Sequence, residues 1–214
     1  QLEGRFGTGA IEHVLLGGTD YFHTGWQHHR DAVSPAVVLP LLDIFNPVPR
    51  GSAAYAGNLI PSTYTRSNGE QFGLYGQDQM SVGNLRITVG GRYDWADETQ
   101  VDQLEQARTR IKANAFTWRA GAVYLFDNGL APYLTYATSF QPSSGQTYDG
   151  TPFEPTTGQQ WEGGLRWQPV GSQIYVTLGA YQITQQNITT PDPNPGHVCG
   201  GGTCSVQTGE ARIR

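Results

Sequence analysis

Two cysteines near the end of the chain have a spacing that implies chemistry. Cys199 and Cys204 stand in a segment rich in glycine and proline, shortly after His197. One interpretation is a zinc site, but structural zinc needs four ligands and only these three are nearby. The other is a small disulfide that limits the freedom of a loop in an oxidising compartment. The ligand count favours the disulfide.

Three histidines, His23, His28 and His29, form a second group that could bind a metal. They would do so only if His23 faced the lumen together with His29, and solvated loop histidines are commoner. The sequence has no Gly-x-Ser-x-Gly, His-Glu-x-x-His or phosphate-binding motif. We therefore predict no enzyme activity, no resident cofactor and no metal site.

Four arginines, Arg86, Arg92, Arg119 and Arg166, recur on the polar faces of separate expected strands, with Asp94 and Glu162 for balance. Such side chains can line a wet interior at low cost, where the same charges facing lipid would be expensive. An interior that attracts anions is the alternative role, and the net charge of −5 argues against it.

The composition excludes several classes of protein. Charged residues make up only 14% of the 214 residues, against roughly 25% in ordinary soluble domains, and the mean hydropathy is −0.43. A pI near 5.4 without a basic cluster argues against nucleic-acid binding. No apolar run reaches the roughly 18 residues of a membrane-spanning helix, and no signal peptide begins the chain.

Alternation of apolar and polar residues predicts β-strands throughout the chain. From Leu85 to Trp95 one face carries Leu, Ile, Val, Gly, Tyr and Trp, and the other carries Arg, Thr, Gly, Arg and Asp. Residues 116–126 and 161–167 repeat this pattern. Further strands are expected near 1–7, 11–28, 70–82, 131–141 and 172–188, with a start near 206. In 70–82 and 172–188 both faces carry apolar residues, so no lipid-facing side is assigned there.

Short and long connections alternate between these strands. Short turns are expected at about 7–10, 81–84, 127–129 and 169–172, where glycine and asparagine favour tight hairpins. Long loops are expected at about 29–69, 99–113, 142–157 and 189–206. In an up-and-down sheet this order places all short turns at one end, as in bacterial outer-membrane barrels.

The sequence therefore predicts an all-β, antiparallel, up-and-down transmembrane β-barrel segment, with residues 1–214 forming part of one domain. Aromatics at strand ends fit the two girdles of such a barrel. A soluble β-sandwich also has alternating strands, but its strands are shorter. Eight complete strands and part of a ninth are expected. We interpret the chain as the middle of a larger barrel, because open sheet edges cannot lie in lipid.

Several motifs resemble TonB-dependent siderophore receptors, and among these most closely the ferrichrome (hydroxamate) receptors. They are Gly90-Gly91-Arg92-Tyr93-Asp94-Trp95, Phe116-Thr117-Trp118-Arg119, Tyr124-Leu125-Phe126-Asp127-Asn128-Gly129, Ser139-Phe140-Gln141-Pro142-Ser143-Ser144 and Phe45-Asn46-Pro47-Val48. The resemblance covers nearly the whole chain and keeps the family's order.

This resemblance implies a monomeric 22-stranded barrel in the bacterial outer membrane, surrounded by lipid and filled by an N-terminal plug. It also implies uptake of a ferric siderophore, whose iron is held by the chelator, driven by the TonB complex through a segment before the plug. The four arginines would then face the plug. Plug, TonB-binding segment and closing C-terminal strands are missing from the 214 residues.

The resemblance also suggests ligand-binding residues. Phe45, Tyr55 and Tyr64 fall in the expected loop 29–69, and aromatic walls with phenol groups suit a compact ferric hydroxamate. Phe140 would border the same mouth. The alternative for each is packing between loops, and for Phe140 an anchor in the aromatic girdle.

Other functions remain open. The loop 29–69 diverges from the family after Phe45, so cobalamin, haem or a sugar are alternative ligands. A passive porin-like channel and an outer-membrane enzyme are the rivals of a different class.

Overall fold

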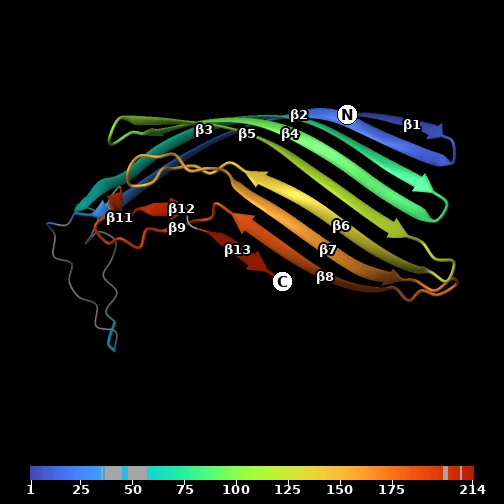
Figure 1. The fold of residues 1–214 in the computed structure, drawn as a ribbon. Coiled ribbons are helices and arrows are strands. Elements are labelled where there is room, and N and C mark those ends of the chain that lie inside the picture. The colour runs from blue at the N-terminus through green and yellow to red at the C-terminus, as the bar shows by residue number, and fades with distance from the viewer. Residues whose placement is uncertain (35, 37–44, 48–56, 200–201, 208) are drawn as a thin grey trace.

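A computed structural model describes residues 1–34, 36, 45–47, 57–199, 202–207 and 209–214. The prediction for Tyr55 lies outside the described residues. One antiparallel sheet of nine strands dominates, in the order β1-β2-β3-β4-β5-β6-β7-β8-β13 (Figure 1). Its strands are β1 Leu2–Thr8, β2 Ile11–Val33, β3 Leu59–Val82, β4 Leu85–Asp102, β5 Ala107–Tyr124, β6 Leu130–Gln141, β7 Thr156–Trp167, β8 Val176–Gln186 and β13 Glu210–Ile213. The predicted all-β up-and-down architecture is confirmed, and within these residues the sheet is open.

Consecutive strands are neighbours, so the connections collect at two ends of the sheet. We call the end with the β1–β2, β3–β4, β5–β6 and β7–β8 connections the turn end, and the opposite end the loop end (Figure 1). Gly9 and Gly83 adopt positive φ angles of 65° and 51° in the two tightest turns. These left-handed conformations cost glycine little. The fourth connection, 168–175, is longer than the expected turn 169–172.

The segment at about 99–113 is not a long loop. Strands β4 and β5 stay paired as far as Asp102 and Ala107, and residues 103–106 close the hairpin. The Asp102 carboxylate accepts backbone N–H bonds from Leu104 and Glu105 at 2.8 and 3.1 Å. The sequence pattern failed here because charged and polar residues occupy both faces of this hairpin, which leaves no alternation to detect.

The first long loop is also shorter than predicted. Strands β2 and β3 pair from the turn end up to Val33 and Leu59, so the connection is 34–58 and not 29–69. Among the residues that this lengthening adds to the strands, His29 and Arg30 of β2 and Thr65 and Arg66 of β3 are again polar on both faces. The connections 142–155 and 187–209 lie close to their predicted bounds.

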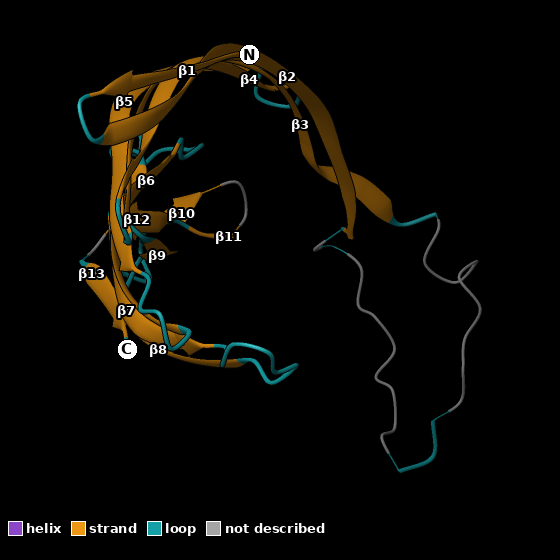
Figure 2. Cartoon of the chain, turned by 90° about the vertical axis from the view of Figure 1, so that its right-hand side faces the viewer, coloured by secondary structure: helices purple, strands orange, loops and turns teal. Residues whose placement is uncertain are grey.

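The segment between β8 and β13 contains four short strands. These are β9 Thr189–Pro191, β10 Val198–Cys199, β11 Gly202–Thr203 and β12 Ser205–Gln207, with β12 paired to β9 and β10 to β11. Seen along its strands, the large sheet forms an arc, and β9 to β12 lie inside that arc (Figure 2).

Strand register assigns one chemical character to each side of the sheet. Side chains paired across the strands form rows, for example Phe72 with Trp95, and Val89 with Ala120, Tyr136 and Trp161. We call this side the apolar face. Its rings contact one another, with Tyr136 and Trp161 centroids 4.6 Å apart. Register also resolves the two ambiguous strands, since it puts Phe72, Leu74 and Met80 of β3 and Val176 and Leu178 of β8 on the apolar face.

The core of this sheet is minimal among the described residues. Ile111, Phe153 and Cys204 are the buried hydrophobic residues, while Leu134, Phe116 and Leu178 are 56%, 63% and 64% exposed. Large apolar side chains exposed along a whole face indicate contact with a non-aqueous environment. No helix in the described part of the chain is long and apolar enough to cross a membrane.

Candidate functional site on the polar concave face

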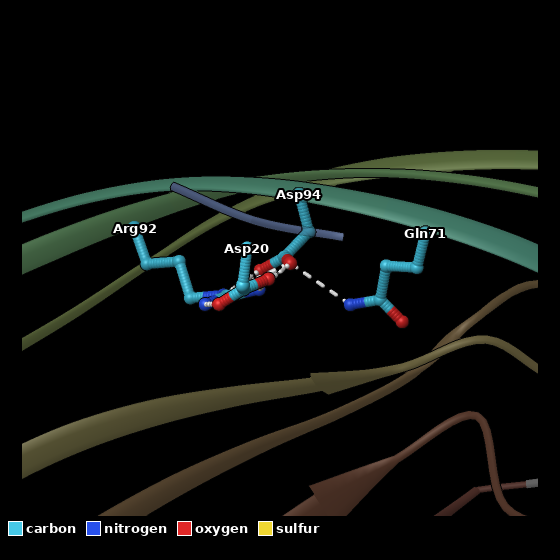
Figure 3. Close-up of polar contacts among 4 residues, drawn as sticks. All are labelled: Asp20, Gln71, Arg92 and Asp94. Carbon is cyan, nitrogen blue, oxygen red and sulfur yellow. Dashed lines mark hydrogen bonds and ion pairs between the residues drawn. The ribbon is translucent and has the colours of Figure 1, made fainter. Parts of the chain in front are cut away.

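The opposite side of the sheet, which we call the polar face, carries a charged cluster contributed by three neighbouring strands. Figure 3 shows Asp20 of β2, Gln71 of β3, and Arg92 and Asp94 of β4 together on the concave side. Register explains this meeting, because Gly73 pairs with both Asp20 and Asp94, and Tyr75 pairs with Arg92.

One guanidinium serves two carboxylates in this cluster. Arg92 Nε donates to Asp94 Oδ2 at 2.7 Å, and Arg92 Nη2 donates to Asp20 Oδ1 at 2.8 Å. Gln71 Nε2 also donates to Asp94 Oδ1, at 2.8 Å. Asp94 is only 4% exposed. A buried carboxylate is stable only with such partners, and the cluster keeps one surplus negative charge.

Gly73 makes this arrangement possible. A Cβ at this position would lie 2.0 Å from Arg92 Nη2 and 2.8 Å from Asp20 Oδ1. The space that a side chain would fill is therefore occupied by the guanidinium. Glycine is needed here because Arg92 approaches the backbone closely. It is not needed for an unusual backbone angle, since the φ of Gly73 is not positive.

A second polar group lies on β6 and β7. Tyr133 Oη donates to Glu162 Oε1 at 2.8 Å, and the Arg166 guanidinium lies 4.9 Å from the centre of the Tyr133 ring. Gln160 Nε2 donates to the other Glu162 oxygen at 3.2 Å.

All four predicted arginines lie on the polar face. Arg119 donates to the Gln77 side chain, and Arg86 donates to the carbonyl of Leu85 at 3.1 Å. Within the described residues only Arg92 of the four has a carboxylate within 4.0 Å. A hollow of about 410 Å³ lies between Arg92 and Arg119, with Leu16, Tyr75, Gln77 and several glycines also lining it. The polar face thus offers unneutralised guanidinium groups and a shallow recess to whatever fills the arc.

The predicted ligand-binding aromatics do not converge. Tyr64 lies within β3, on the same face as His29, which belongs to the apolar face by register. It accepts a hydrogen bond from Gln27 Nε2 at 2.7 Å. Phe140 likewise shares the face of Leu134 and Tyr136, as the girdle alternative for this residue expects. By register neither side chain points into the arc, and the ligand role of both residues stays a prediction.

Phe45 is 92% exposed, and its role in ligand contact stays a prediction. His23 and His29 share the apolar side of β2, where His23 lies 4.0 Å from Glu70. Within the described residues no group of three or more potential metal ligands exists.

The structure joins Cys199 and Cys204 in a disulfide. Cys204 is 1% exposed, its N–H donates to the His197 carbonyl, and its own carbonyl accepts from Asp192 N–H at 2.8 Å. The bridge therefore belongs to the framework that shapes the segment from Asp192 to Cys204.

Tyr148 was not predicted as a site residue, and His197 was considered only as a zinc ligand. Their rings stack 4.1 Å apart and join two different connections. Sequence analysis also missed Asp20 and Gln71 as members of the charged cluster. The phase of β2 was hidden because apolar residues occupy both of its faces. No signal within β2 pointed to Asp20, because the glycine that leaves room for its partner Arg92 is Gly73, on the neighbouring strand.

Comparisons with known proteins agree with this geometry. A family model described as "TonB dependent receptor-like, beta-barrel" matches residues 1–214. The chain is 37% identical to a ferrichrome outer membrane transporter/phage receptor of Escherichia coli, over 100% of this chain and 28% of that protein. It is 39% identical to a ferrioxamine B receptor of Salmonella typhimurium, over 90% of this chain and 26% of that protein. The chain thus spans less than a third of the length of these relatives.

Two solved structures share the fold. The ferric-catecholate import receptor Fiu of Escherichia coli aligns with a TM-score of 0.71 at 21% identity, covering 98% of this chain and 32% of that chain. The ferric preacinetobactin receptor BauA of Acinetobacter baumannii aligns with a TM-score of 0.70 at 19% identity, covering 98% and 31%.

Proposed function

The chain belongs to the TonB-dependent receptor β-barrel family, and from this premise we propose that the whole protein imports ferric hydroxamate siderophores across the bacterial outer membrane. The observation that carries the proposal is the identity of 37% and 39% to receptors for ferrichrome and ferrioxamine B, extending over nearly all of this chain. Both ligands present iron already enclosed by hydroxamate groups, so direct coordination by protein side chains is unnecessary.

The two faces of the sheet support this role. The apolar face, with its rows of aromatic and aliphatic side chains, suits outer-membrane lipid. The polar face suits the wet interior of a larger barrel, where Arg86, Arg119 and Arg166 would meet a plug. We assign the loop end to the outside of the cell and the turn end to the periplasm, because long loops lie outside in this class of barrel.

Transport requires energy. We propose that the TonB complex supplies it by contacting a segment N-terminal to these residues, as the family resemblance implies. The protein carries its ligand without chemical change, and we expect it to work as a monomer.

Uptake by living cells tests the proposal. Receptor-deficient cells carrying the full-length gene are given iron-labelled ferrichrome or ferrioxamine B, with and without an intact TonB system. We expect uptake of at least one complex that disappears without TonB. Uptake that persists without TonB would instead indicate a passive channel. A folded receptor that takes up neither complex would contradict the hydroxamate assignment, and cobalamin, haem and sugars would be assayed next.

A further inference from the structure

Two connections at the loop end are tied together inside the arc. Asn187 Nδ2 donates to the Pro155 carbonyl at 3.1 Å, and Glu154 N–H donates to Gln207 Oε1 at 2.7 Å. Gln207 Nε2 also donates to the Asn187 carbonyl, at 3.0 Å. These contacts join the connection 142–155 to the segment that holds β9 to β12, which Figure 2 shows within the concave side of the sheet.

The ring of His197 is fixed on this framework by bonds to both nitrogens. Nδ1 lies 2.7 Å from Asp192 Oδ2, and Nε2 lies 3.1 Å from Asn194 Nδ2. The amide of Asn194 is oriented by its own oxygen, which accepts the Gly196 N–H at 2.9 Å. Its NH₂ group therefore faces His197. The two contacts together fix the plane of the imidazole ring.

Tyr148 stacks on this fixed ring. The two ring centres are 4.1 Å apart and the planes differ by 4°. Tyr148 nevertheless remains 55% exposed, because the stack covers one side of the phenol ring. Its connection is anchored on both sides, by Ser144 Oγ donating to Glu98 Oε2 at 2.7 Å and by Phe153, which is 7% exposed.

An aromatic side chain that is exposed and yet held rigid loses little conformational freedom when a ligand covers it. Ordinary surface tyrosines lack such support. A ferric hydroxamate presents an apolar outer surface with a few carbonyl oxygens, which an open ring face and a phenol hydroxyl can contact together.

We propose that Tyr148 is a ligand-contacting residue for the ferric hydroxamate, and that His197 positions its ring. This inference rests on the proposed function and adds a residue that none of the sequence motifs indicated. His197 itself is a positioning residue, since it acts through the orientation of Tyr148.

The test uses purified full-length receptor and measures the Kd of ferrichrome and ferrioxamine B. We expect Tyr148→Leu to weaken binding of the transported complex by about tenfold. Tyr148→Phe keeps the ring and should stay within about threefold of the wild type. Tyr124→Leu, a matched exposed tyrosine on the apolar face, should bind as the wild type does.

The positioning role of His197 has its own readout in a double-mutant cycle. His197→Leu should weaken binding when Tyr148 is present and should add no loss in the Tyr148→Leu background, because the two changes act through one ring. Additive losses would show that His197 acts independently and would overturn its positioning role.

The possible failures are distinguishable. If the wild type binds a hydroxamate complex and folded Tyr148→Leu binds it equally well, the inference about Tyr148 is wrong while the proposed function stands. If folded wild type binds neither complex, both fall. Folding of each variant is checked by its heat-modifiable migration on gels.

Discussion

At the scale of single residues, one guanidinium organises the best-defined part of the polar face. Arg92 bridges Asp20 and Asp94, and Asp94 is buried to 4% exposure. Its removal would leave that carboxylate with Gln71 as the one remaining side-chain donor among the described residues. Removing the partner of a buried carboxylate lowers the free energy of unfolding more than removing the partner of an exposed one.

We predict that Arg92→Gln lowers the stability of the full-length barrel by about 1–3 kcal/mol. Arg110→Gln is the matched control, because Arg110 is exposed and its partner Asp97 is much less buried than Asp94, and it should cost less than about 1 kcal/mol. Thermal unfolding followed by gel migration measures both. Equal decreases in unfolding temperature in the two variants would mean that the burial of Asp94 does not add to the stability effect of its ion pair.

A second prediction at this scale concerns Gly73. Gly73→Val places a side chain where Arg92 now lies, so the guanidinium must leave both carboxylates. We expect a destabilisation comparable to that of Arg92→Gln. Gly76→Val on the same strand is the control, since the nearest atom to a Cβ there is 3.9 Å away. The prediction fails if Gly73→Val added to Arg92→Gln lowers stability by the sum of the two single changes.

At the scale of elements, strand β6 contributes alternate side chains to the apolar face and to the polar face. Leu134 is on the apolar face and its neighbour Thr135 is on the polar face. We predict that Leu134→Arg costs about 2–4 kcal/mol or prevents folding into bilayers, because a charge in the middle of lipid is expensive. Thr135→Arg should be tolerated beside Glu162. The yield of folded, membrane-inserted receptor distinguishes the two, and similar yields would contradict the assignment of faces.

The segment between β8 and β13 should loosen in acid. The Asn194 N–H, followed by His197, lowers the pKa of Asp192 below its ordinary value. A carboxylate with a depressed pKa in the folded state stabilises above its ordinary pKa and loses that effect as the pH falls below about 4. We expect faster amide hydrogen exchange at Asn194 and His197, relative to β6, between pH 4 and 3. Asp192→Asn should remove this pH dependence, and an unchanged profile in that variant would exclude Asp192 as the cause.

Sequence patterns predicted elements well where the two faces of a strand differ. Strand β4 from Leu85 to Trp95 was located by alternation, and so were its polar arginine and aspartate. The same strand continues to Asp102 through a stretch in which polar residues occur on both faces, so alternation carries no information there. Tyr64 was expected in a loop for the same reason. It lies in the first part of β3, where the sequence does not alternate between apolar and polar residues.

The candidate site was less predictable than the fold. The four arginines were found from strand phase, but their partners depend on register across strands that are far apart in sequence, such as Asp20 and Arg92. The stack of Tyr148 on His197 depends on how two loops fold over each other, which no local pattern encodes.

At the scale of the whole molecule, the nine-stranded sheet has two unpaired edges, β1 and β13, within the described residues. Both edges and the apolar face need partners, which a closed barrel in lipid supplies. We predict that residues 1–214 produced alone aggregate or require denaturing detergent, whereas the full-length protein migrates as a compact heat-modifiable species. A soluble, monomeric form of the 214-residue segment would contradict this prediction.

Toward its tip the hairpin of β4 and β5 carries polar residues on both faces, with Ile111 as a buried exception, and its ladder is unbroken up to residues 103–106. Evolution can therefore lengthen or shorten this tip without changing the apolar face closer to the turn end. Changes in steps of two residues per strand preserve which side chains face inward, and a single-residue step inverts them. Natural variation in the height of this hairpin should consequently come in even increments.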